Sequence, residues 1–133
     1  MKSDKGTSKK KTILLIDDET DWLTAMSGAL EGQSYKLILA DSGESALIKL
    51  NESKPDLILA DVRMPVMNGF ELFEKVRSNP KLKAIPYVFM SSIDDYDAIH
   101  VAKQLGADDY VTKPFDSQDA KDVVEKLMKQ FNL

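Results

Sequence analysis

Four short, unbroken apolar runs constrain the fold of this chain most strongly, because each one ends at a polar residue. The runs cover residues 13–16, 57–60, 87–90 and 110–112. The polar residues that follow them are Asp17 with Asp18, Asp61, Ser91 and Lys113. Runs of this length and composition are typical of strands that are covered on both faces, as in a parallel sheet.

The carboxyl ends of parallel strands meet at one edge of the sheet, and ligands bind outside that edge. The sequence therefore predicts that three carboxylates, one hydroxyl and one ammonium lie close together. Carboxylates at such close range raise each other's pKa unless a cation lies among them. A hard divalent cation with oxygen ligands fits this set, so we expect a Mg²⁺ site.

Helix patterns alternate with the strand patterns along the whole chain. The expected strands cover about 12–16, 35–40, 57–60, 87–90 and 109–112, and a helical apolar stripe follows each. Ser42 and Asp116 are expected helix N-caps, and Gly106 an expected helix end. This alternation predicts an α/β fold of the (βα)₅ type, a doubly wound, flavodoxin-like parallel sheet with strand order 2-1-3-4-5.

Charge divides the chain into a basic start and an acidic body. Residues 1–11 hold five lysines and one aspartate, a charge of +4, whereas the whole chain carries −4 and the remainder therefore −8. We interpret residues 1–11 as a disordered tail and 12–133 as one domain. An acidic body repels phosphate backbones, so direct binding to nucleic acid is not expected.

Composition excludes several classes of site. The chain has no cysteine, which rules out disulfides, thiolate catalysis and cysteine-bound zinc, and His100 is the only histidine. A site with several histidine ligands is therefore impossible. No apolar stretch reaches the length that spans a bilayer, and no signal peptide is visible, so we expect a cytoplasmic protein without membrane insertion.

The polar residues at the strand ends occur within longer motifs. The two longest motifs cover residues 61–69 (DVRMPVMNG) and 106–115 (GADDYVTKPF). Together with Asp17, Asp18 and Ser91 in this order, they resemble the receiver domain of two-component response regulators. The resemblance extends from Thr12 to about Phe131. It implies a self-phosphorylating signalling protein rather than a conventional enzyme.

The resemblance also implies individual roles. Asp61 would be the phosphoacceptor, and a carboxylate that attacks phosphorus gives an acyl phosphate. Mg²⁺ would be held by Asp18, Asp61 and the backbone carbonyl of Arg63, with Asp17 acting through water. Lys113 would supply a positive charge to the phosphoryl oxygens and Ser91 a hydroxyl. A helix-capping role for one of the two adjacent acids is compatible with this assignment.

Two further pairs of positions have family roles. Ser91 and Tyr110 occupy the positions of the conformational switch, although a half-buried strand tyrosine is an equally good interpretation of Tyr110. Arg63 and Ile93 lie two residues after Asp61 and Ser91, where side chains flank the path of hydrolytic water. We expect them to slow dephosphorylation, unless both simply face solvent.

Partner surfaces are expected next to the site and on one face of the domain. The expected docking residues for a histidine kinase or histidine phosphotransfer protein are Trp22, Ala25, Pro114 and Phe115. A downstream protein target is expected on the face of the fourth helix, fifth strand and fifth helix. We interpret the chain as a single-domain response regulator. The alternatives are a receiver from a hybrid kinase or larger regulator, and a small aspartate-based phosphatase, for which Arg63 occupies the position of a second acid.

Overall fold

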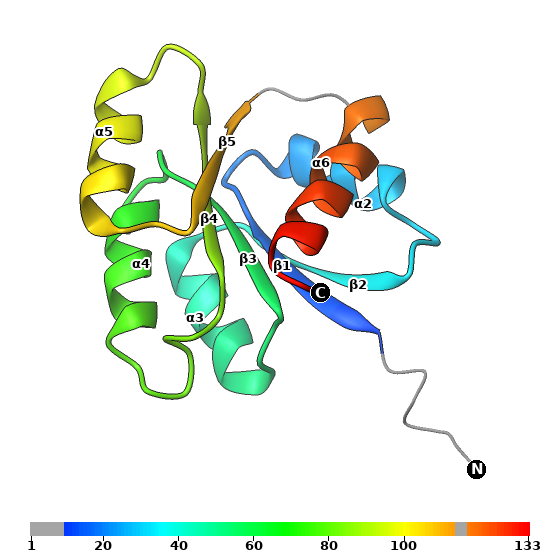
Figure 1. Cartoon of the computed structure of the whole chain (residues 1–133), viewed down its shortest axis with the longest axis horizontal. Coiled ribbons are helices and arrows are strands. Elements are labelled where there is room, and N and C mark those ends of the chain that lie inside the picture. Colours follow the sequence, from blue (N-terminus) through cyan, green and yellow to red (C-terminus); the bar gives the residue numbers. More distant parts are fainter. Residues whose placement is uncertain (1–9, 114–116) are drawn as a thin grey trace.

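The computed structural model describes residues 10–113 and 117–133, and its centre is a five-stranded parallel sheet (Figure 1). The strand order is β2-β1-β3-β4-β5, as the sequence predicts. The strands are β1 (Lys11–Ile16), β2 (Tyr35–Ala40), β3 (Leu57–Asp61), β4 (Tyr87–Ser92) and β5 (Asp109–Lys113). All four neighbouring pairs run parallel. The fold class expected from the alternating pattern is therefore confirmed.

Among the described residues, five helices cover the two faces of this sheet. They are α2 (Thr20–Ala29), α3 (Gly43–Glu52), α4 (Gly69–Arg77), α5 (Tyr96–Leu105) and α6 (Ser117–Gln130). Helices α2 and α6 lie on one face, and α3, α4 and α5 on the other (Figure 1). Within the same part of the chain, no helix is both long and apolar enough to cross a membrane.

Strand residues alternate between two cores, one under each helical layer. Leu14, Ile16 and Ile58 belong to the core beneath α3, α4 and α5, whereas Ile13 and Leu15 belong to the core beneath α2 and α6. Because both faces are covered, the central strands are apolar almost throughout, and β3 is buried along its whole length. This explains why these runs lack the polar alternation of a half-exposed sheet.

The strand register brings the chemically active residues level with one another. Asp61 lies opposite Met90, so Ser91 follows one step beyond it on the neighbouring strand. Ser91 in turn lies opposite Thr112, and Lys113 is next along β5. On the other side of β3, Ile16 pairs with Ala60, which places Asp17 level with Asp61. The sheet edge thus collects side chains that are far apart in sequence.

Local capping residues mark the starts of α3 and α4 and the end of α5. The Ser42 side chain accepts a hydrogen bond from the Ser45 backbone and caps α3. Asn68 and Glu71 form a reciprocal capping box at the start of α4. Gly106 ends α5 in the left-handed conformation, with φ of 78°, as the sequence predicts. The expected cap of α6, Asp116, lies outside the described residues.

Several element boundaries differ slightly from the sequence-based expectation. Strand β1 begins at Lys11, where its partner is Tyr35 at the start of β2. Strand β4 continues beyond its apolar run to Ser92, which pairs with Lys113. Backbone pairing with a neighbouring strand, rather than side-chain polarity, sets these ends. Residues 1–9 of the expected tail lie outside the described part of the chain.

Candidate functional site

Asp61 occupies the carboxyl end of β3, in the middle of the sheet. It is only 7% exposed. The first residue of α4, Gly69, packs directly against it, because a Cβ atom built on Gly69 would lie 2.4 Å from the Asp61 carbonyl oxygen. The Gly69 amide also donates to the Val62 carbonyl, and Tyr87 donates its hydroxyl proton to the Gly69 carbonyl. The backbone around the carboxylate is therefore closely held.

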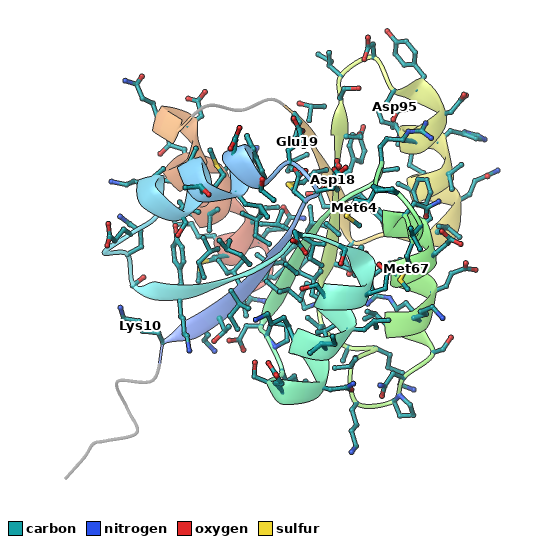
Figure 2. The ribbon with its side chains drawn as sticks, turned by 180° about the vertical axis from the view of Figure 1, so that it is seen from behind. Lys10, Asp18, Glu19, Met64, Met67 and Asp95 are labelled. Carbon is teal, nitrogen blue, oxygen red and sulfur yellow. The ribbon has the colours of Figure 1, made fainter. Side chains whose placement is uncertain are left out.

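The two adjacent acids after β1 lie in different environments. Asp17 is completely buried, whereas Asp18 is exposed. One Asp17 oxygen accepts a hydrogen bond from the Glu19 amide at the start of α2. In Figure 2 Asp18 is labelled in the upper half of the view, next to Glu19 and far from Lys10. Asp17 is thus part of the interior, and Asp18 faces the opening of the site.

Lys113 extends from the end of β5 into this group of acids. Its ammonium lies 2.5 Å from Asp17 Oδ2, 3.0 Å from Glu19 Oε1 and 3.7 Å from Asp61 Oδ1. It also lies 4.8 Å from the ring centroid of Trp22. Burial lowers the pKa of Lys113, but hydrogen bonds to Asp17 and Glu19 outweigh that effect and hold the pKa above its usual value. The Lys113 side chain therefore stays protonated and carries a positive charge.

Asp61 carries the most strongly perturbed carboxyl of the site. Burial, followed by the negative charge of Asp17, raises its pKa from the usual 3.8 to about 7, although Lys113 opposes the rise. Burial likewise raises the pKa of Asp17, against the hydrogen bond from Lys113. The single ammonium of Lys113 does not compensate for the two buried carboxylates of Asp17 and Asp61. When both are ionised, the site therefore attracts additional positive charge.

The chemistry of the donor atoms fits a divalent cation. Asp17, Asp18 and Asp61 each offer a carboxylate oxygen, and the three atoms lie within 4.8 Å of one another. Hard cations with oxygen ligands favour such clusters. These residues are therefore suitable ligands for an ion such as Mg²⁺, and a cation among their oxygens would relieve the repulsion that contributes to the raised pKa of Asp61.

An open cleft connects these groups to solvent. Its lining residues are Asp18, Glu19, Trp22, Asp61, Arg63, Ser91, Ser92, Asp95 and Lys113. Ser91 is 3% exposed, and its hydroxyl has no hydrogen-bond partner among the described residues. A buried hydroxyl without a partner is costly, so its presence beside Asp61 is consistent with a ligand that accepts its proton.

Arg63 and Ile93, the expected water-access residues, differ in their surroundings. Arg63 lines the cleft and makes two hydrogen bonds to Asp95, Nε to Oδ2 at 2.8 Å and a terminal nitrogen to Oδ1 at 2.7 Å. Ile93 is 72% exposed and is not part of the cleft lining. The solvent-facing interpretation thus describes Ile93, whereas Arg63 has a specific partner at the start of α5.

The remaining predicted residues lie around the site. Tyr110 is half-buried and packs against the core beneath α3, α4 and α5. Trp22 is half-buried beneath the Lys113 ammonium, and Ala25 is exposed about one helical turn further along α2. Pro114 and Phe115 lie outside the described residues. The structure therefore places Trp22 next to Lys113 in the ionic cluster, and its docking role stays a prediction.

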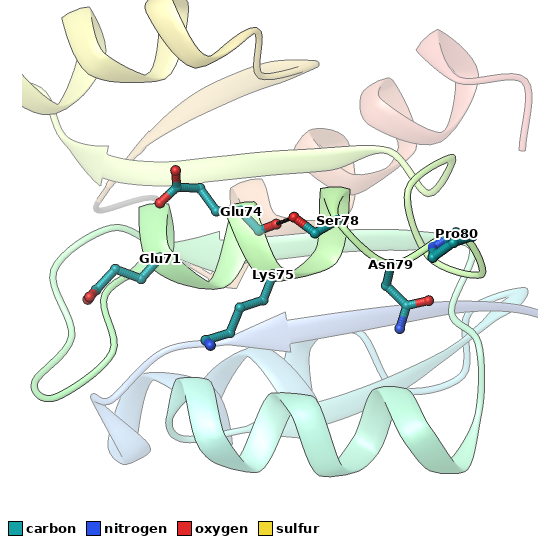
Figure 3. A pocket seen from close by; sticks show the side chains of 6 residues that line it. All are labelled: Glu71, Glu74, Lys75, Ser78, Asn79 and Pro80. Carbon is teal, nitrogen blue, oxygen red and sulfur yellow. Dashed lines mark hydrogen bonds between the residues drawn. The ribbon is translucent and has the colours of Figure 1, made fainter.

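A second hollow on the surface lies away from these groups. It is lined by Glu71, Glu74, Lys75, Ser78, Asn79 and Pro80, along the outer side of α4 and the turn that follows (Figure 3). The Ser78 hydroxyl donates to the Glu74 carbonyl within the helix. Its mixed, solvent-facing side chains lack the cluster of carboxylates and ammonium found beside Asp61, so the cleft beside Asp61 is the candidate site.

Comparison with known proteins identifies the family. The response regulator receiver domain matches residues 13–125. The chain belongs to the response regulator receiver family. Over 121 residues it is 35% identical to the alkaline phosphatase synthesis transcriptional regulatory protein PhoP of Bacillus subtilis, covering 90% of this chain and 49% of PhoP. The resemblance that the motifs indicate is therefore confirmed.

Solved structures of receivers have the same architecture. The chemotaxis response regulator CheY4 of Vibrio cholerae matches with a TM-score of 0.79 at 27% identity, covering 90% of this chain and 99% of CheY4. The signal receiver domain of a signal transduction histidine kinase from Syntrophus aciditrophicus matches with a TM-score of 0.77 at 28% identity, covering 90% of this chain and 91% of that one. The receiver spans about half the length of PhoP and about a quarter of the Salmonella typhimurium regulator ZraR.

Three residues of the receiver site escaped the sequence interpretation. Glu19 contacts Lys113, Asp95 binds Arg63, and Gly69 packs on Asp61. Glu19 follows the acid pair directly, so its position in the chain was a usable signal. Gly69 lies within the motif after Asp61, but nothing in the sequence links it to a close backbone contact. Asp95 is 32 positions from Arg63 and has no local signal.

Proposed function

We propose that this receiver accepts a phosphoryl group on Asp61 from a histidine kinase or a histidine phosphotransfer protein and signals by phosphorylation-dependent binding of a protein partner. One observation carries the proposal. The buried Asp61 carboxylate has the Lys113 ammonium 3.7 Å from one oxygen. It shares an open cleft with the Ser91 hydroxyl, which has no hydrogen-bond partner in the described part of the chain. A nucleophile, a cation and a proton donor therefore converge where a phosphoryl group can enter.

In the proposed transfer, a carboxylate oxygen of Asp61 forms a bond to phosphorus while the bond between phosphorus and the donor's imidazole nitrogen breaks. The electron pair of that bond leaves with the nitrogen, which takes up a proton from solvent to give a neutral imidazole. Lys113 neutralises charge on a phosphoryl oxygen, and Ser91 donates its hydroxyl proton to another. The product is an acyl phosphate on Asp61, and the transfer needs no oxidant or reductant.

Asp18 and Asp61, with the Arg63 carbonyl and Asp17 acting through water, are the residues that we propose to hold Mg²⁺. When bound, the ion supplies charge neutralisation and orientation for the phosphoryl oxygens. The side chains of the site position the other charged groups around the phosphoryl group. Asp17, already hydrogen-bonded to Lys113 and to the Glu19 amide, fixes the ammonium within reach of Asp61.

The conformational response is proposed to pass through Ser91 and Tyr110. Ser91 lies at the site, and Tyr110 lies on the neighbouring strand, two residues before Thr112, the strand partner of Ser91. The Tyr110 side chain packs against the core beneath α3, α4 and α5. The surface formed by α5, β5 and α6 is the proposed binding face for a downstream protein, and the protein is proposed to act in the cytoplasm.

Metal binding is expected to depend unequally on the two adjacent acids. Asp18→Asn should weaken Mg²⁺ affinity by at least about tenfold, because the change removes a charged ligand from a site with few others. Asp17→Asn should have a smaller effect, since Asp17 is buried against Lys113. Isothermal titration of both variants and the wild type measures the difference, and equal affinities in all three proteins would contradict this ligand assignment.

Two phosphate compounds separate a signalling acceptor from the alternative of a small phosphatase. Phosphoramidate has a phosphorus–nitrogen bond, as phosphohistidine does, and should phosphorylate the chain with one group per molecule. A chromogenic ester, p-nitrophenyl phosphate, should not be turned over repeatedly, because Arg63 occupies the position at which a second acid would protonate the leaving group. Sustained release of nitrophenol over many turnovers would favour the phosphatase.

The single-domain interpretation has one alternative with a specific observation behind it. The chain spans only 49% of PhoP and 26% of ZraR, and both of those proteins are transcriptional regulators. The receiver of a larger regulator would perform the same phosphoryl transfer at Asp61. The proposal for the site is therefore the same under either organisation, and only the downstream partner differs.

A further inference from the structure

Lys113 is not the only cationic side chain that lines the cleft beside Asp61. Arg63, two residues after Asp61, also lines it, and its guanidinium is held by a two-point ion pair with Asp95. The Arg63 side chain is 66% exposed and that of Asp95 is 14% exposed. Planar, two-point contacts of this kind are the strong form of an arginine–carboxylate pair, and they fix the direction of the guanidinium.

Asp95 is held in place independently of Arg63. It is the N-cap of α5, where its side chain accepts a hydrogen bond from the Ala98 amide at 3.3 Å. Its own backbone amide donates to the Ser92 carbonyl at 3.1 Å. The turn from Ser92 to Asp95 directly follows Ser91, so the ion pair joins the loop after the phosphoacceptor to the loop after the hydroxyl residue. These hydrogen bonds hold Asp95 in place at the edge of the cleft.

Arg63 is within electrostatic reach of the phosphoacceptor. The hydrogen bond to Asp95 and then the charge of Asp95 raise the pKa of Arg63, and the negative charges of Asp97 and Asp61 act in the same direction. A phosphoryl group on Asp61 is expected to carry a charge between about −1.5 and −2 and has three acceptor oxygens. It therefore presents a stronger anion than the carboxylate it replaces, and it extends from Asp61 into the cleft that Arg63 lines.

We infer that Arg63 is a second phosphoryl-binding residue and that Asp95 is a positioning residue that restrains it before transfer. In the unphosphorylated chain Asp95 keeps the guanidinium at the edge of the cleft. During transfer the phosphoryl oxygens compete with Asp95 for the same donors, so breaking the ion pair is part of the barrier. This inference rests on the proposed function, because it requires a phosphoryl group on Asp61.

The test compares rates of phosphorylation in four variants and the wild type. The variants are Asp95→Asn, Arg63→Gln, the double variant and Asp94→Asn. Asparagine caps helices as well as aspartate does, so Asp95→Asn releases Arg63 while it preserves the start of α5. Asp94 lies in the same turn but bonds to Ser92 rather than to Arg63, so Asp94→Asn controls for the loss of one negative charge. The readout is the initial rate of phosphoryl gain by intact mass with acetyl phosphate and Mg²⁺.

We expect Asp95→Asn to phosphorylate about threefold faster than the wild type and Arg63→Gln about threefold slower. Asp94→Asn should match the wild type, and adding Asp95→Asn to Arg63→Gln should change nothing, because there is no guanidinium left to release. An Asp95→Asn rate equal to that of the wild type, or the same acceleration in the Arg63→Gln background, would overturn this inference alone. Absence of any phosphoryl gain in the wild type would overturn the proposed function and the inference with it.

Discussion

Asp61→Asn is expected to make the metal-free protein more stable, and the gain should grow with pH. Burial and the charge of Asp17 raise the pKa of Asp61 from 3.8 to about 7 in the folded chain. Each tenfold change in proton affinity is worth about 1.4 kcal/mol, so this rise corresponds to an upper value of about 4 kcal/mol. Asparagine has a similar shape and no charge, and therefore removes that cost.

The direction of the pH dependence follows from the two pKa values of Asp61. Below pH 3.8 the carboxyl is protonated in both the folded and the unfolded chain, and ionisation costs no stability. Between pH 3.8 and about 7 the folded chain retains a proton that the unfolded chain has lost, so stability falls as pH rises. Above about pH 7 the full cost is present.

Urea unfolding with EDTA present measures this gain. The difference between Asp61→Asn and the wild type should increase by roughly 2 kcal/mol from about pH 5 to about pH 8. Asp122→Asn, at an exposed position of α6, removes the same charge and should show no such trend. Saturating Mg²⁺ should stabilise the wild type more than the variant and narrow the gap. If the difference in unfolding free energy between Asp61→Asn and the wild type did not depend on pH, the raised pKa of Asp61 would be contradicted.

Gly69→Ala is expected to destabilise the receiver by about 3 kcal/mol and to impair phosphorylation. The new Cβ atom would lie 2.4 Å from the Asp61 carbonyl oxygen and 3.1 Å from both the Asp61 carbonyl carbon and the Val62 Cα. All three are backbone atoms, so no side chain can rotate away. The α4 start or the end of β3 must move, and either movement displaces the phosphoacceptor.

Gly28→Ala provides the matched control, since Gly28 lies in helix α2 and a Cβ atom placed on it would meet nothing within 4 Å. Alanine there should stabilise the chain by about 0.5–1 kcal/mol, because glycine disfavours helix interiors. Thermal unfolding and the extent of phosphorylation measure both variants. Equal stability of Gly69→Ala and the wild type would show that the close approach of α4 to Asp61 is readily relaxed.

The sequence predicted the fold because its signals are local and strong. The apolar runs that end at Asp17, Asp61 and Ser91 require burial on both faces, and a parallel sheet between helix layers provides it. Parallel strands also place their carboxyl ends at one edge, so the convergence of Asp61 with Lys113 follows from topology alone. Neither inference needs any knowledge of side-chain conformation.

The details of the site depend on side-chain directions that the sequence does not encode locally. Asp17 and Asp18 are adjacent and identical, yet Asp17 is buried against Lys113 whereas Asp18 is exposed and lines the cleft. The sequence alone does not indicate which of the two acids is buried. The Arg63–Asp95 pair joins two loops 32 residues apart. Its formation depends on the lengths of both loops and on where α5 begins.

Trp22 lies at the margin of the core beneath α2 and α6 and makes a contact that the sequence did not predict. The sequence indicated a tryptophan at the edge of the first helix, suitable either for a docking surface or for the margin of the core. In the structure its half-buried ring lies 4.8 Å from the Lys113 ammonium. The two residues lie at opposite ends of the chain, and the alternation of strands and helices gives no information about their contact.

The central claim is that Asp61 is the acceptor of a phosphoryl group. Its most direct test is the intact mass of the wild type and of Asp61→Asn after incubation with acetyl phosphate and Mg²⁺, followed by treatment with hydroxylamine. The account predicts one phosphoryl group on the wild type, its removal by hydroxylamine as expected of an acyl phosphate, and none on Asp61→Asn. A phosphoryl group that persists on Asp61→Asn, or that resists hydroxylamine on the wild type, would contradict it.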